Sequence, residues 1–493
     1  MRLERLLDPV PLVSGIVFVG MLWGITVGES PSLTIVAGLV TILTVKLLWR
    51  PGQPPTLLLL AAIHLLQVTT ALVYTNLTGV NINSLSDYGV DLENATLVAL
   101  GGVFCLILGM SLGDAGPAVW SPEVAQAEAR SWSPRSAFRF FVVTLGIGSF
   151  FGLLSTLSEG VRQLFLAGAG IQWIGIFLLA YVCLLQRRGF SYLLVAVGIE
   201  ITIGFTGYFG EFRNVFFALF VAFASVRPKV NFKSIVTIII TAAFALVLMA
   251  YWSAIKEDYR KFVNEGSNAQ VVLVPLEDRF AYLIDRANNL DADTLATGFD
   301  LLFKRIAYVE FFGATLHFVP DGRPHENGAM TMNAISHIFF PRLLFPDKAP
   351  LPNDTAVTIA YTGLPMSLSS GASISIGYPG ELYIDYGVLG MMACMGIIGF
   401  FYGKASRFIQ QHFDSALVSY GATVSLLLPG LYFETSLPKT LGGVITWFII
   451  LLLMSKFVLP FALNALAWKE RTTVRPRWSV IARYPVDDTE IPI

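Results

Sequence analysis

Residues 55–75, which read PTLLLLAAIHLLQVTTALVYT, carry no Asp, Glu, Lys or Arg. A helix of about 20 apolar residues crosses the hydrocarbon core of a bilayer. Because unpaired backbone groups are not tolerated in lipid, a run of this kind must be helical there. The stretch therefore predicts a transmembrane helix.

Similar apolar runs recur along almost the whole chain. Of the 493 residues, 55% are hydrophobic and 14% are charged, whereas soluble domains carry about 25% charged residues. We expect an all-α polytopic transmembrane helical bundle of about twelve spans. The predicted spans are 11–28, 32–49, 55–75, 96–112, 138–157, 165–186, 190–207, 209–226, 234–254, 379–403, 415–434 and 440–463.

The distribution of Lys and Arg predicts the orientation of these spans. Alternate loops are rich in cations, whereas the other short loops hold only Arg162, Arg213 and Lys439. The positive-inside rule then places both termini in the cytoplasm. The first span lacks a small-residue cleavage site, so we expect it to be retained.

The long segment 255–378 falls on the outer side and is rich in aromatic and amphipathic stretches. Loops of this length are usually functional or disordered, and the apolar content argues against disorder. The predicted organisation is transmembrane helices over 1–254, a large, partly helical outer loop over 255–378, further spans over 379–464 and a cytoplasmic tail over 465–493.

Several cations border the outer face and predict a pocket for an anionic lipid head group: Arg213, Arg286, Arg305, Arg342 and Lys348. The planar fork of a guanidinium matches phosphate oxygens. Two alternatives stay open. Arg213 can anchor a helix end, and the loop cations can pair with neighbouring acidic residues in solvent.

Carboxylates in the same region are candidates for acid–base chemistry. Glu381 and Asp385 lie four residues apart and would share a helix face, and Glu211 precedes Arg213. The alternative for Glu381 is a helix start, where a carboxylate is favoured. His337 is a further candidate, although an isolated histidine among apolar neighbours is more often structural.

No nucleotide-binding or nucleophile-elbow motif is present, so we expect no cofactor. Cys105, Cys183 and Cys394 lie within apolar runs without metal-ligand spacing, and we expect no metal. Asp291-Ala-Asp293 is too short a match to predict a metal site.

Four segments resemble the Wzy-type polymerases of bacterial surface polysaccharides. They are Gly210-Glu-Phe-Arg213, Arg305-Ile-Ala-Tyr-Val-Glu-Phe-Phe312, Phe340-Pro-Arg-Leu-Leu-Phe-Pro-Asp-Lys-Ala-Pro350 and Gly380-Glu-Leu-Tyr-Ile-Asp-Tyr-Gly-Val-Leu-Gly390. The likeness covers roughly 205–395. The chain departs from it at Phe345, where the family often has Trp.

The resemblance implies a glycosyltransferase in the bacterial inner membrane, with the large loop in the periplasm. It would transfer a growing glycan from undecaprenyl pyrophosphate to the non-reducing end of a lipid-linked repeat unit. Tyr383 would join the substrate-binding residues. A chain-length regulator and a flippase are the implied partners, and nucleic acid is not. An O-antigen ligase, or a flippase or transporter for lipid-linked oligosaccharide, stays open as an alternative.

Overall fold

The computed structural model describes residues 9–155, 162–207, 212–226, 232–266, 272–340, 345, 351–366 and 374–460. The first half contains α1 (Pro9–Val27), α2 (Pro31–Leu48), α3 (Thr56–Thr78), η2 (Ile82–Leu85), α4 (Leu92–Gly113), α5 (Pro122–Ser131), α6 (Pro134–Leu154), α7 (Arg162–Ala169), α8 (Gln172–Gln186), α9 (Phe190–Thr206), α10 (Arg213–Val226) and α11 (Phe232–Val263). The second contains α12 (Leu276–Asn288), α13 (Ala292–Ile306), α14 (Glu310–Phe318), α15 (Ala329–Phe339), α16 (Asp354–Thr362), α17 (Tyr378–His412), α18 (Ala416–Leu427), η4 (Leu428–Gly430) and α19 (Leu437–Phe457).

Within these described ranges the chain is helical and forms no strand. Nine of the described helical segments are long and apolar enough to cross a membrane. Three shorter apolar segments, Phe190–Thr206, Arg213–Val226 and Ala416–Gly430, occupy further predicted spans. The prediction of an all-helical, multi-pass membrane protein is therefore confirmed, whereas the number of about twelve spans stays a prediction.

Local sequence signals explain many helix starts. Proline occupies the first turn of α2, α6, α17 and α19, where its missing N–H costs nothing. Asp91, Ser133 and Ser415 cap α4, α6 and α18 through side-chain acceptors. At the other end, α3 stops at Gly79 in the left-handed conformation.

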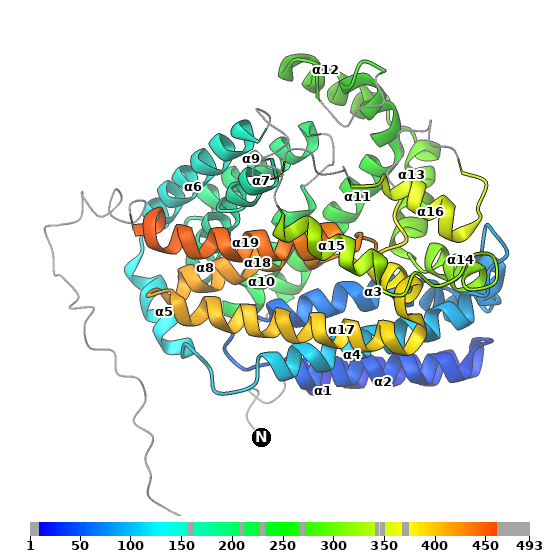
Figure 1. The fold of residues 1–493 in the computed structure, drawn as a ribbon. Helices are drawn as coiled ribbons and strands as arrows, with labels where there is room; N and C mark the ends of the chain where they lie inside the picture. The colour runs from blue at the N-terminus through cyan, green and yellow to red at the C-terminus, as the bar shows by residue number, and fades with distance from the viewer. Residues whose placement is uncertain are drawn as a thin grey trace, which may run out of the picture.

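Among the described helices, α4 and α17 form the most extensive pairing, and they lie side by side in Figure 1. Gly109 and Gly113 on α4 face Gly399 and Gly403 on α17, so each helix presents glycines four residues apart. A Cβ atom at any of these four positions would overlap backbone atoms of the opposite helix. Small residues at this spacing let transmembrane helices approach closely, and they hold α17 against the bundle.

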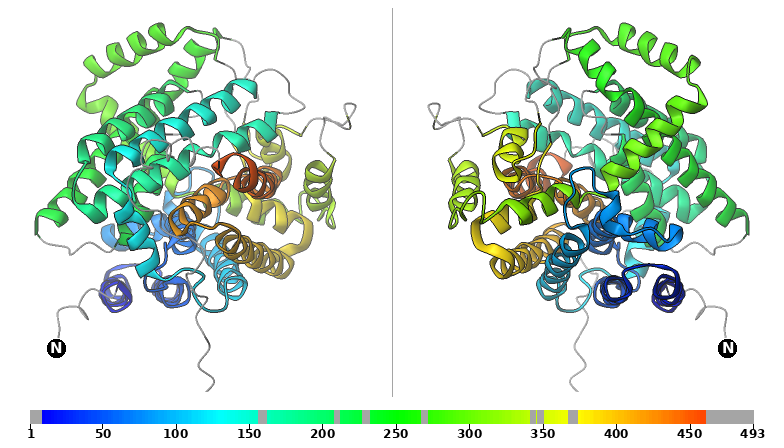
Figure 2. Two further views of the ribbon diagram at one scale, coloured as in Figure 1. Left: turned by 90° about the vertical axis from the view of Figure 1, so that its left-hand side faces the viewer. Right: turned by 90° about the vertical axis from the view of Figure 1, so that its right-hand side faces the viewer.

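Other helices surround this pair. Of the spans, α8 is the most deeply enclosed and α1 the least, and α1 and α2 lie at one edge of the bundle in Figure 2. The predicted span 165–186 is broken between α7 and α8. At the break, Gly170 lies so close to the Trp447 ring on α19 that a larger side chain would not fit.

The long segment after α11 is partly helical. Its first residues extend α11 to Val263, beyond the predicted end of that span at residue 254. α13 packs against α11, with Gly298 against the Ala250 backbone. Of the amphipathic stretches predicted here, 280–284 lies in α12, and 301–312 covers the end of α13 and the start of α14. Figure 1 shows α12 projecting from the bundle, whereas α15 packs along α17 and α19.

Candidate functional site

Four cations from three helices gather at one end of α10. Arg213 opens α10, Lys256 and Arg260 lie one turn apart on α11, and Arg305 is in the last turn of α13. The Lys256 ammonium interacts electrostatically with Arg305, Arg260, Glu434 and Arg213. We call Arg213, Lys256, Arg260 and Arg305 the cation cluster.

Glu434, in the turn before α19, ties this cluster to the bundle. Its Oε1 lies 3.5 Å from Arg305 Nη2, and its Oε2 accepts a hydrogen bond from Gln67 Nε2 at 2.7 Å. Gln67 Oε1 in turn accepts the backbone N–H of Phe433 at 2.8 Å. A glutamine midway along α3 thus orients the carboxylate that holds Arg305.

Tyr432, two residues before Glu434, positions Arg213. Its guanidinium carbon lies 4.6 Å from the centre of the Tyr432 ring, a cation–π distance. Stacking on a ring uses none of the guanidinium N–H donors, and within the described residues these donors form no hydrogen bond, so they can bind a phosphate.

Among the residues that the structure describes, cations outnumber carboxylates around Lys256. Within the described ranges, the charges that act on Lys256 are those of three arginines and of one carboxylate, Glu434. The Arg305 and Glu434 side chains are 30% and 17% exposed, so the site is partly enclosed yet reachable. Arginines and a lysine converging with excess positive charge suit a phosphate or pyrophosphate group.

The two predicted carboxylates of α17 lie one turn apart and are buried, with Glu381 5% and Asp385 2% exposed. Glu381 Oε2 accepts the backbone N–H of Leu437, the first residue of α19, at 2.9 Å. Asp385 accepts the N–H groups of Met330 and Thr331 at 3.0 and 2.7 Å, and the Thr331 hydroxyl at 2.6 Å.

Each carboxylate therefore accepts hydrogen bonds from backbone N–H groups at the start of another helix. That helix is α19 for Glu381 and α15 for Asp385. Carboxylates are favoured at helix N-termini, so the geometry gives both a structural role. Both Asp385 oxygens are occupied, whereas Glu381 Oε1 accepts no hydrogen bond within the described ranges. That oxygen keeps Glu381 as a candidate base.

The remaining predicted residues fall elsewhere. Tyr383 is buried and donates its hydroxyl to the Val319 carbonyl at 2.7 Å. Arg286 lies on α12, 3.5 Å from Asp258, and is not among the charges acting on Lys256. His337 is in the last turn of α15. Glu211, Arg342 and Lys348 lie outside the described residues.

A second polar cluster packs against the N-terminal part of α17. Arg323 Nη2 lies 3.0 Å from Glu326 Oε1, and the Tyr361 hydroxyl donates to the same oxygen at 2.6 Å. The Tyr361 hydroxyl and Arg323 hold the pKa of Glu326 below its usual range, and burial raises the pKa of Tyr361 to about 12. These internal contacts hold the loop around residue 325 against the Ile384 carbonyl.

Sequence reasoning missed Gln67, Lys256, Arg260 and Glu434. Gln67 had a usable signal, since a polar residue inside an apolar span is a functional candidate. Glu434 and Lys256 lie at or just beyond the ends of predicted spans. Charged residues are common there, so their position did not mark them as functional.

Comparisons with protein-family models, with curated proteins and with solved structures found no match to this chain. Beyond the class that the fold defines, a helical multi-pass membrane protein, function must be argued from the site itself.

Proposed function

We propose that this protein is a membrane glycosyltransferase that polymerises a bacterial surface polysaccharide from lipid-linked repeat units. The observation that carries the proposal is the convergence of the cation cluster on Glu434 beside apolar spans, with more cations than carboxylates among the described residues. A donor ending in a lipid pyrophosphate needs this combination: cations for the pyrophosphate and bilayer for the polyprenyl chain. The identity of the product as a polysaccharide and of the carrier as undecaprenyl pyrophosphate rests on the resemblance to Wzy-type polymerases.

In the proposed reaction the cation cluster binds the pyrophosphate of the donor. A hydroxyl of the acceptor sugar attacks the anomeric carbon of the growing glycan. The new glycosidic bond forms as the bond to undecaprenyl pyrophosphate breaks, and the hydroxyl proton passes to a base. Glu381 is our candidate for that base. The arginines stabilise the charge of the departing pyrophosphate. The step needs no nucleotide because the pyrophosphate leaving group is already part of the donor.

The proposed setting is the bacterial inner membrane, with about twelve spans, both termini in the cytoplasm and residues 255–378 in the periplasm. The arrangement of lysine and arginine along the chain supports it. Single cysteines in a cysteine-free background test it. A cysteine near Arg323 should react with an impermeant reagent in intact cells, and one near Arg188 only after permeabilisation. Labelling near Arg188 in intact cells would contradict the proposed orientation.

Deletion of the gene separates the proposed function from its alternatives. Loss of polymer with retention of single repeat units on the lipid acceptor is the expected result. Unattached polymer would instead indicate a ligase. Loss of all surface glycan would indicate a flippase or transporter, and an unchanged glycan profile would refute the proposal.

A further inference from the structure

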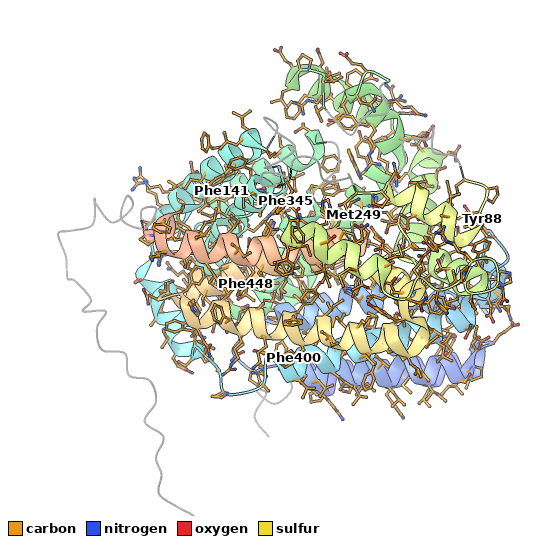
Figure 3. All side chains as sticks on the ribbon, in the orientation of Figure 1. Tyr88, Phe141, Met249, Phe345, Phe400 and Phe448 are labelled. Atoms are coloured by element: carbon orange, nitrogen blue, oxygen red, sulfur yellow. The ribbon has the colours of Figure 1, made fainter. Side chains whose placement is uncertain are left out.

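A groove of about 970 Å³ runs along one side of the bundle between α15, α17 and α19. This is at the upper end of ligand-pocket volumes, about 300–1,000 Å³. The three helices lie side by side in Figure 1. Its walls are mostly apolar, with Phe339 from α15, Ile397 from α17 and Val444 from α19. Phe448, labelled in Figure 3, continues the α19 wall.

Among the described residues, the charge that lines the groove is confined to one end. Among its described lining residues, Lys404 and Arg407 carry the charge, and Gln411 lies one turn beyond Arg407. At the opposite end the lining residues are Thr331, Leu382 and Leu437. An amphipathic ligand would therefore place its polar group at Lys404 and Arg407.

The two cations keep their charges available. The carboxylate that they act on is Asp114, and Arg50 already lies 3.3 Å from it and donates to the Asp114 and Gly116 carbonyls. Within the described ranges neither Lys404 nor Arg407 forms an ion pair. Lys404 instead lies 5.7 Å from the centre of the exposed Phe400 ring.

We infer that this groove binds an anionic glycerophospholipid, with its phosphate at Lys404 and Arg407 and its acyl chains along α17 and α19. Basic pockets between transmembrane helices bind anionic lipid head groups, and the apolar walls match acyl chains. The choice of a phospholipid rests on the single charged end together with the long apolar channel. The inference is independent of the proposed function.

Native mass spectrometry of the purified full-length protein tests the inference, with phosphatidylglycerol titrated against phosphatidylcholine. We expect tight binding of phosphatidylglycerol and weak binding of phosphatidylcholine. Each surface cation contributes about 1 kcal/mol to an anionic lipid, which is about fivefold in affinity. Lys404→Ala with Arg407→Ala should therefore weaken binding about thirtyfold. Lys46→Ala, an exposed cation in the last turn of α2, is the matched control and should bind as the parent does.

A second variant tests the role of the apolar walls of the groove. Ala405→Trp places a large ring in the groove wall and should reduce binding of phosphatidylglycerol with both cations retained. Equal binding of the two lipids, or a double variant that binds like the parent, would overturn the inference. So would an equal loss in Lys46→Ala, which would indicate nonspecific surface attraction, or displacement of phosphatidylglycerol by a polyprenyl phosphate. If the double variant does not fold, two measurements still test the inference. They are the comparison of the two lipids on the parent protein and the binding of phosphatidylglycerol to Ala405→Trp.

Discussion

Replacing Arg305 by alanine is the most direct test of the cation cluster. The change removes one guanidinium from the group around Lys256 and leaves Glu434 with Gln67 as its hydrogen-bonding partner. A hydrogen bond to a charged group contributes about 1.5–3 kcal/mol. If Arg305 holds the pyrophosphate in the transition state, kcat/KM should fall about tenfold to a hundredfold. Arg305→Lys should recover only part of this loss, because an ammonium cannot bind two oxygens through a planar fork.

The assay is polymerisation of lipid-linked repeat units by purified protein in nanodiscs, with products resolved on a gel and a melting curve for each variant. Arg286→Ala is the matched control. That arginine was a predicted site residue, but its side chain is 45% exposed and faces Asp258 on the surface, where ion pairs contribute little. We expect less than about a twofold change for the control. If Arg305→Ala polymerises normally, or if both variants lose activity equally, the cation cluster is not the pyrophosphate site.

Three further predictions concern α17. Glu381→Gln keeps an oxygen for the Leu437 N–H, so the fold should survive while polymerisation stops; an active Gln variant would exclude Glu381 as the base. Asp385→Ala removes the acceptor of three hydrogen bonds at the start of α15. It should cost at least the roughly 0.5–2 kcal/mol of a helix cap and speed amide exchange in α15, and unchanged exchange would contradict this role. Gly399→Leu should lower the melting temperature through overlap with α4, whereas Gly146→Leu, with open space around it, should not; equal shifts would refute the close-packing argument.

The helical, membrane-spanning character of the fold could be predicted from sequence because hydrophobic length is a local property. Each apolar run must satisfy its own backbone, so a window of about 20 residues is enough to predict a span. The division of one predicted span into α7 and α8 was not visible in this way. Nor was the contact of Gly170, between these two helices, with Trp447 from another helix. The α4–α17 pairing had a signal in its spaced glycines, but no local rule says which helices pair.

The candidate site was predictable only in part. The sequence predicted Arg213 and Arg305 as binding residues, and the structure brings both of them to Lys256. It also predicted that Glu381 and Asp385 share a face, which follows from helical spacing alone. It could not show that these carboxylates meet the starts of α19 and α15, because those contacts join residues far apart in the chain.

By itself the sequence determined that this is a helical membrane protein with cationic and acidic residues near span ends, since composition and periodicity act over one helix at a time. Tertiary structure decided which charges meet. Gln67, Glu434 and Arg305 come from three distant segments and make one network, whereas Arg286 faces Asp258 instead. The physical reason is that charges interact according to distance in space, and only the packing of the helices sets that distance.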